Sequence, residues 1–495
     1  MKLSSTVMQV LTDGEMEQIW QTALRVWGQL ALRAQGTEEL NEALLDFGYQ
    51  VNGEQIRFPK AVQEKVRARL ADSREEKGPG RPARVVGEKL TYAASGQGLH
   101  YHDIETDTLR PAAAQDMADW SRLCDCFPDL GRAHPTLIPQ VVPNSSCDLH
   151  AFATIILNSE RPWPVSVFNA QMLPFFIELQ AVCDGSVEKV RENPIFAAKC
   201  WLNSPFMITR ENIEIGMQAR ELLDKPFEIS TMPVAGVATP TTLAGALTQN
   251  LAEILACNTV TLALDDRLIG NCAGPLVFDM RTGVHTEVGP DSHLLRLATA
   301  QLAAHIFGGE YRGGGWPITA AKLPGAQSMM EKALDALWGL CNGARSFGGL
   351  GTLAETDVGS AVQLMLDLEL MGHCRRLLAG ITVDAGRIAE QLITEVAPTG
   401  AHYLETDHTL QYFREELWSP RLMDRRVPCH WLYIPLTAAR ALVGNCLPPV
   451  WSICEPVEPR QSASKSAPTT CQHVVSTSLL AFACAAGTRT ARASG

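Results

Sequence analysis

A carboxylate and two aromatic side chains lie at or near the ends of apolar runs in this 495-residue chain. Asp279 ends the run V-F-D, Trp316 follows the glycines of R-G-G-G-W-P, and Phe347 lies in R-S-F-G-G-L-G. A carboxylate can neutralise a cation and an aromatic face can bind one, so these three are candidate catalytic groups. Each also has a structural interpretation: an ion pair with Arg281 for Asp279, packing under a loop for Trp316, and a plain tight turn at Phe347.

The residues around Phe347 form a second group of candidates. Gly348 and Gly349 lack a Cβ atom and permit close backbone approach to a ligand, so they are candidates for cofactor binding. Arg345 could hold a substrate carboxylate with two parallel hydrogen bonds, or could make a surface ion pair. Glu310, in G-G-E-Y-R, is a further candidate for substrate binding, or a bottom-face residue that serves stability.

Tyr101, His402 and His408 complete the candidates for substrate binding. Tyr101 lies in Y-H-D, before the main apolar runs, where a lid could reach a pocket. The two histidines are separated as H-x5-H, which is not the i,i+4 pair of a zinc helix. They line a pocket or hold the C-terminal segment in place. No metal site is expected.

Composition and charge limit the classes of function. The net charge of -12 repels phosphate backbones, which argues against a nucleic-acid partner. The 14 cysteines are scattered, no signal peptide is visible, and no apolar run reaches the length of a membrane span. We therefore expect a cytoplasmic protein without a membrane association.

The order of predicted elements indicates the fold. Residues 1–90 read as a helical accessory region with a hairpin turn at Asn52 and Gly53. From about residue 130, apolar runs alternate with amphipathic helices. The predicted strands are near 132–142, 163–169, 195–203, 226–235, 274–280, 309–319 and 344–351, and the predicted helices near 145–159, 171–183, 210–224, 241–257, 290–307, 325–342 and 360–379.

This alternation is typical of a parallel sheet covered by helices, and the number of repeats favours a closed (β/α)8 TIM barrel. The barrel domain is expected at 91–440, with residues 380–384 as the best candidate for an eighth strand. Residues 259–264 read either as a strand or as the end of a helix. Residues 441–495 have no amphipathic period and are expected to form a loose tail.

Several segments resemble the trimethylamine methyltransferase family, and their order and spacing are more specific than any one of them. They are S-P-F-M-I-T at 204–209, P-V-A-G-V-A-T-P-T-T-L-A-G-A-L-T-Q-N-L-A-E-I-L-A at 233–256, D-M-R-T-G at 279–283, Q-S-M-M-E-K-A-L at 327–334, and H-Y-L-E-T-D-H-T-L-Q-Y-F-R-E-E-L-W-S-P-R-L-M-D-R at 402–425.

The resemblance implies a (β/α)8 methyltransferase that moves a methyl group from a tertiary or quaternary methylamine to the cobalt of a partner corrinoid protein. The chain has no pyrrolysine, so it is similar to the branch for which glycine betaine and related amines are typical substrates. A corrinoid carried by the partner is then the expected cofactor, and a homo-oligomer the expected assembly.

The chain departs from the family pattern at acidic positions. Ala320 stands at an acidic place in T-A-A-K, and Gly325 stands at another in G-A-Q. Two alternatives therefore stay open: a family member that binds an amine or a corrinoid protein without turnover, and a different TIM-barrel enzyme. The second would need carboxylates or histidines converging at several strand ends.

Overall fold

The computed structural model describes residues 4–86, 89–133, 136–162, 164–270, 273–423 and 425. The tail expected at 441–495 lies outside the described residues.

The helices lie where the amphipathic patterns predict them, and residues 259–264 belong to a helix rather than to a strand. The helices that follow the central strands are α5 (Cys147–Asn158), α6 (Leu173–Asp184), α8 (Arg210–Leu223), α9 (Leu243–Asp265), α10 (Pro290–Phe307), α11 (Ala326–Cys341) and α12 (Ala361–Ala379). The others are α1 (Asp13–Gln29), α2 (Glu38–Phe47), α3 (Lys60–Lys77), α4 (Ala114–Asp125), α7 (Val187–Glu192), α13 (Ala385–Ile388), α14 (Glu390–Val396) and α15 (Asp407–Glu416).

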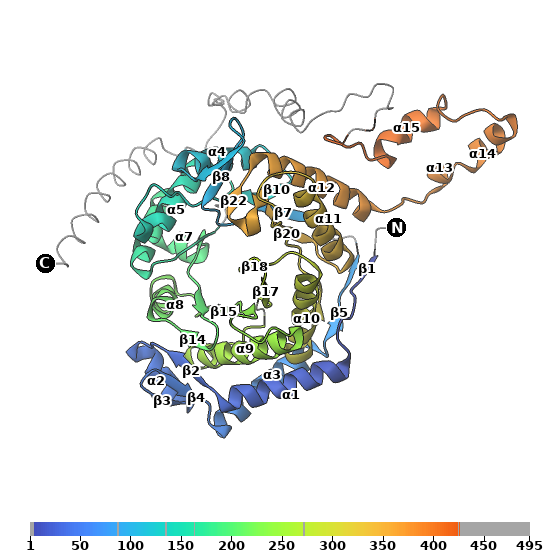
Figure 1. The fold of residues 1–495 in the computed structure, drawn as a ribbon. Helices are drawn as coiled ribbons and strands as arrows, with labels where there is room; N and C mark the ends of the chain where they lie inside the picture. The colour runs from blue at the N-terminus through green and yellow to red at the C-terminus, as the bar shows by residue number, and fades with distance from the viewer. Residues whose placement is uncertain are drawn as a thin grey trace.

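The central strands are short and pair in parallel. They are β7 (Thr91–Ala94), β10 (Leu130–Ala133), β11 (Val165–Ser166), β12 (Phe196–Ala197), β13 (Cys200–Leu202), β15 (Ile229–Thr231), β16 (Val234–Ala235), β17 (Leu276–Asp279) and β20 (Ser346–Leu350). Parallel pairs join β11 to β12, β13 to β15, β16 to β17, β20 to β7 and β7 to β10, and Gly315 bridges to Phe347 of β20. Helices α5, α8, α9, α10, α11 and α12 surround these strands (Figure 1).

The strands are therefore arranged as arcs of a mixed α/β fold. Among the described residues, no ladder joins β10 to β11 or β17 to the segment around Gly315, so a closed barrel is not observed.

The expected eighth strand is wrong. Residues 380–384 form no strand, and β7 instead lies between β10 and β20. The segment T-Y-A-A of β7 is short and follows polar residues, so its apolar content gave little signal.

The N-terminal region packs on the central part through a shared core. Trp27 of α1, Leu40 of α2 and Val66 of α3 belong to the same buried cluster as residues of α9 and α10 such as Leu255 and Leu302. The predicted hairpin is present, with β3 (Gln50–Asn52) antiparallel to β4 (Gln55–Arg57). The remaining strands are β1 (Ser4–Thr6), β2 (Ala31–Ala34), β5 (Arg81–Pro82), β6 (Arg84–Val86), β8 (His100–Asp103), β9 (Thr108–Pro111), β14 (Met207–Ile208), β18 (Val284–Thr286), β19 (Glu310–Tyr311), β21 (Thr352–Leu353) and β22 (Val358–Gly359).

Helices α13, α14 and α15 project from the ring of helices (Figure 1). No residue between 379 and 423 is buried, and Arg376 of α12 ties α15 to the body by donating to the carbonyl oxygen of Glu416 at 2.7 Å. Within the described residues, no helix has both the length and the apolar character that a membrane crossing demands.

Candidate functional site

The carboxyl ends of parallel strands define one edge of this fold, and the side chains there come from several loops. Glu331 and Glu355 both contact Thr319, on the segment that also carries Trp316, and Glu287 contacts Glu355. Glu287 follows β18, Glu331 lies on α11, and Glu355 follows β21. We call this group the acidic mouth: Glu287, Glu331 and Glu355.

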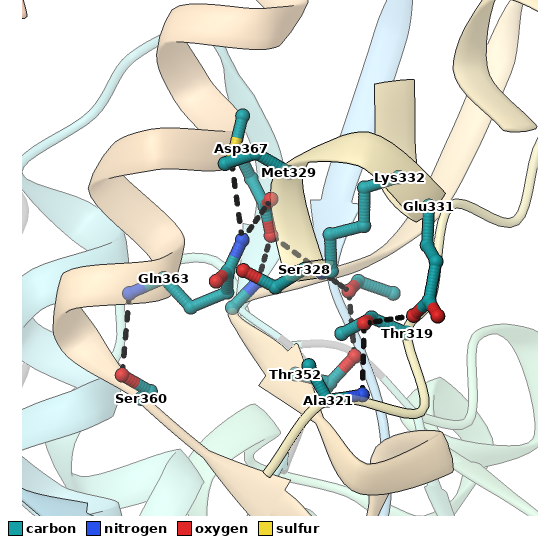
Figure 2. A network of polar contacts seen from close by, with 12 residues as sticks. Thr319, Ala321, Ser328, Met329, Glu331, Lys332, Thr352, Ser360, Gln363 and Asp367 are labelled. Atoms are coloured by element: carbon teal, nitrogen blue, oxygen red, sulfur yellow. Dashed lines mark hydrogen bonds and ion pairs between the residues drawn. The ribbon is translucent and has the colours of Figure 1, made fainter. Parts of the chain in front are cut away.

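Glu331 of α11 binds the backbone at Ala320, where the sequence departs from the family pattern. Its Oε2 accepts a hydrogen bond from the hydroxyl of Thr319 and another from the backbone N–H of Ala320 at 3.0 Å (Figure 2). Gln327 donates to its Oε1 at 3.0 Å. The carboxylate that contacts the backbone at Ala320 thus comes from a helix, within the family-like segment 327–334.

Glu355 joins two loops of the mouth. Its Oε1 accepts from the hydroxyl of Thr286 at 2.6 Å, and its Oε2 accepts from the backbone N–H of Glu287 at 3.0 Å. Its own N–H donates to the carbonyl oxygen of Thr319 at 2.8 Å. Its φ of +56° lies in the left-handed region, which a residue with a side chain adopts at some cost. These contacts hold that conformation in place.

Glu287 is a carboxyl group that titrates near neutrality. Burial raises the pKa of Glu287 to about 7. The positive charge of Arg296 opposes this shift, and the negative charge of Glu355 adds to it. Arg296 itself is ion-paired with Asp335 of α11. The mouth thus combines negative charge with partial exclusion of water, which suits a cation.

Trp316 lies on the segment that leads to Thr319, the residue that contacts both Glu331 and Glu355. Its ring packs against Gly348, where an added Cβ atom would lie 2.1 Å from Cζ3 of the indole. Only a glycine at 348 leaves room for this ring. The ring is half-buried, so part of the indole stays open to solvent.

Asp279 lies at the end of β17 as predicted, but its partner is Arg281. The backbone N–H of Arg281 donates to its Oδ1 at 2.8 Å and lowers the pKa of Asp279. This is the ion pair and loop cap of the structural interpretation.

Phe347 and the two glycines lie below the mouth. Phe347 is 1% exposed and packs in the core against Gly315, so it presents no free face to a ligand. Gly349 is buried with a φ of +71°, and its N–H donates to the hydroxyl of Ser95 at 2.7 Å. The described structure gives Gly348 a packing role against Trp316.

Arg345 and Glu310 lie away from the mouth. Arg345 precedes β20, at the amino end of the strand, and donates to the carbonyl oxygen of Ala344 at 2.8 Å. Glu310 is exposed in β19 and pairs with Arg81 at 3.1 Å. The structure therefore does not bring these two candidates together with Trp316, because strand direction puts them at the opposite end.

Tyr101 lies in β8, and Arg110 stacks over its ring at 5.2 Å. Burial raises the pKa of Tyr101 to about 12, so the hydroxyl stays protonated at neutral pH. His402 and His408 lie in the projecting C-terminal segment. His402 is 3.9 Å from Glu405, and the ring of His408 is 3.1 Å from the carbonyl oxygen of Gly386.

A second buried carboxylate was not anticipated from the sequence. Glu253 of α9 is 0% exposed, and its Oε2 accepts from the hydroxyls of Ser204 and Thr231, each at 2.6 Å. Thr231 is the last residue of β15, and Ser204 follows β13. Glu253 is a charged residue inside the long apolar run of α9, and this pattern could have predicted a buried carboxylate with polar partners. Across the described ranges, no group of three or more His, Cys, Asp and Glu side chains is arranged to hold a metal ion.

Comparison with known proteins gives a match over most of the chain. The sequence model of the family described as "Trimethylamine methyltransferase (MTTB)" matches residues 2–434. A glycine betaine methyltransferase of Desulfitobacterium hafniense (strain Y51) is 22% identical over 459 residues, which cover 89% of this chain and 93% of that protein.

Two proteins called trimethylamine methyltransferase MttB are similar over a shorter stretch. The one from Desulfitobacterium hafniense (strain DSM 10664 / DCB-2) is 23% identical over 70% of this chain and 69% of its own length. The one from Methanosarcina thermophila is 24% identical over 70% of this chain and 71% of its own length. The crystal structure of the Methanosarcina barkeri monomethylamine methyltransferase superposes with a TM-score of 0.41 at 11% identity, covering 84% of this chain and 94% of that one.

Proposed function

Because the chain belongs to the trimethylamine methyltransferase family, we propose that it moves a methyl group from a tertiary or quaternary methylamine to the reduced cobalt of a partner corrinoid protein. The relatives act on trimethylamine and glycine betaine by their names, which supports a methylated amine as the substrate class. As part of this proposal, the arcs of parallel strands close into a (β/α)8 barrel with β7 as the strand between β20 and β10.

The acidic mouth is the observation that carries this proposal. A methylated ammonium ion has a positive charge spread over apolar methyl groups. Carboxylates at Glu287 and Glu355 match the charge, and the indole of Trp316 matches the methyl groups by a cation–π contact. Glu331 adds negative charge on the other side of Thr319.

The residues of the chain have little bond-breaking chemistry to do. The corrinoid supplies the nucleophile when its carrier is bound. A quaternary amine leaves as a neutral amine, so no side chain must donate a proton to it. The side chains of the mouth bind the cation, exclude water, and orient one methyl group outward.

Loops at the carboxyl ends of the strands carry exposed apolar side chains that suit a protein partner. Single exposed apolar residues are ordinary, but here they recur on successive loops around one edge. They are Val141, Phe168, Met232, Val237, Met280 and Leu323. A carrier protein seated there would bring its corrinoid over the mouth.

Calorimetric titration with tetramethylammonium, trimethylamine and glycine betaine tests the binding step. We expect Glu355→Gln to weaken binding of these cations by roughly tenfold, since one charge-assisted contact contributes about 1.5 kcal/mol. Glu54→Gln, which alters an exposed pair with Arg33, is the matched control and should leave affinity unchanged.

The transfer step is tested with reduced cobalamin as methyl acceptor and mass spectrometry of the amine. Loss of one methyl group from an amine supports the proposal. An amine that binds but keeps its methyl groups would identify a binding protein instead, and no binding of any methylated amine would refute the proposal.

A further inference from the structure

A lysine and an aspartate form a fully buried ion pair beneath the mouth. Lys332 of α11 is 0% exposed and Asp367 of α12 is 2% exposed, and Nζ lies 2.7 Å from Oδ2. Burial lowers the pKa of Lys332 and raises that of Asp367, and each charge opposes the shift of the other. A buried pair of this kind gives little net stability compared with apolar residues of similar size, so its retention calls for another explanation.

Both partners also bind the turn at the end of β20. Nζ of Lys332 donates to the carbonyl oxygen of Gly349 at 3.0 Å, and Oδ2 of Asp367 accepts from the N–H of Gly351 at 2.7 Å. The hydroxyl of Thr352 donates to the same carbonyl of Gly349 at 2.7 Å (Figure 2). Gly349 and Gly351 have φ of +71° and +80°, a backbone that needs outside contacts to take one conformation.

The turn leads directly into the mouth. After β21, the N–H of Ala354 donates to the carbonyl oxygen of Ala321, and the N–H of Glu355 donates to that of Thr319, each at 2.8 Å. Only three residues, 352–354, separate this turn from Glu355, so the turn and the mouth are joined by a short stretch of backbone.

We propose that Lys332 and Asp367 are a positioning pair, which fixes the turn at 349–351 and so sets the place of Glu355 and the affinity of the mouth for a methylated ammonium ion. The affinity part rests on the proposed function, whereas the fixing of the turn does not.

Two double variants separate the hydrogen bonds from the charges. Lys332→Met with Asp367→Leu removes the charges and both bonds to the turn. Lys332→Gln with Asp367→Asn removes the charges but keeps a donor and an acceptor. Both avoid leaving one charge buried alone.

The control is the ion pair between Arg220 and Asp265, at 2.9 Å, where Asp265 also accepts from the N–H of Phe227. It likewise fixes a loop, at the amino end of β15. Arg220→Met with Asp265→Leu should leave the mouth unchanged.

Hydrogen–deuterium exchange of peptides covering 346–357 measures how firmly the turn is held, and it needs no ligand. For the apolar double variant we expect exchange there to be faster by about tenfold, and the dissociation constant for tetramethylammonium to rise by about tenfold. The amide double variant and the Arg220 control should stay near the parent in both measurements.

Thr352→Val, which removes one bond to the Gly349 carbonyl, should give a smaller rise in exchange. This variant tests the proposal if the apolar double variant does not fold.

Unchanged exchange in the apolar variant, or equal loss in the amide variant, would overturn the positioning role. A parent protein that shows the expected exchange pattern but binds no tetramethylammonium would refute the proposed function and leave the turn-fixing role standing.

Discussion

At the scale of single residues, the site is made of groups that are far apart in the chain. Two of the glutamates, Glu287 and Glu355, lie in segments that follow strands, and Glu331 lies on helix α11. None of the three belongs to a motif that the sequence predicts to be catalytic. The sequence predicts Trp316 as a candidate, and it stays a prediction, on the segment that leads to Thr319. Residue type and position beside apolar runs predict Arg345 and Asp279, but strand direction and a neighbouring arginine decide what they bind.

Glu287 should make cation binding depend on pH. Its pKa is about 7, so the carboxylate is present above that pH and is lost as the pH falls through it. We expect affinity for tetramethylammonium to increase as the pH rises from 6 to 8, by about threefold to tenfold. Calorimetry at several pH values measures this, and Glu287→Gln should remove most of the slope.

The same carboxyl group should affect stability with the opposite sign. The folded protein holds its proton up to about pH 7, whereas the unfolded chain releases it near the ordinary glutamate pKa of 4.5. Stability therefore falls as the pH rises through this window. The thermal midpoint of the parent, compared with Glu287→Gln at each pH, isolates this contribution. If the thermal midpoints of the parent and the variant change with pH by the same amount, this contribution is absent.

Gly348→Ala should displace Trp316. The added Cβ would lie 2.1 Å from the indole and 2.9 Å from Oγ of Ser95. We expect a loss of about 1–3 kcal/mol in the free energy of unfolding, together with weaker binding of tetramethylammonium. Urea denaturation measures the first. Gly314→Ala, which meets no atom within 4 Å, is the control and should cost little.

At the scale of elements, caps and periodicity explain which parts of the fold could be predicted. The central helices are 12 to 23 residues long, and their predicted positions agree closely with the structure. The strands are two to five residues long, which is too short for a period to show, so β7 was missed as a neighbour of β20. The contacts of Glu355 with Thr286, Glu287 and Thr319 join residues that are far apart in the chain. No local sequence pattern predicts such contacts.

Thr12→Ala should loosen the start of α1. The side chain of Thr12 accepts from the N–H of Glu15 at 3.3 Å, and Glu15 accepts from the N–H of Thr12 at 2.8 Å. Loss of this capping box should cost about 1 kcal/mol of unfolding free energy, as urea denaturation would show. Gly14→Ala in the same turn meets no atom and should stabilise the helix by about 0.5–1 kcal/mol.

At the scale of the whole molecule, the N-terminal region and the central helices share one core. A division at residue 90 follows the change of sequence pattern, but Trp27 is 0% exposed in a cluster that includes α9 and α10. The sequence pattern changes near residue 90, but the hydrophobic core continues across that point.

Trp27→Ala should destabilise the whole chain rather than the N-terminal region alone. Removal of a fully buried indole costs about 3–5 kcal/mol. We expect circular dichroism and fluorescence to report one unfolding transition, moved to lower denaturant. Two separate transitions would show that the regions unfold independently.

Helix α11 carries Glu331 and Lys332 as consecutive residues, one turned to the mouth and the other to the interior. Neighbours on an α-helix point about 100° apart, so a one-residue slip of α11 would move both side chains out of their present contacts. Insertions or deletions inside its first two turns should therefore abolish both the contact of Glu331 with Ala320 and the contact of Lys332 with Gly349.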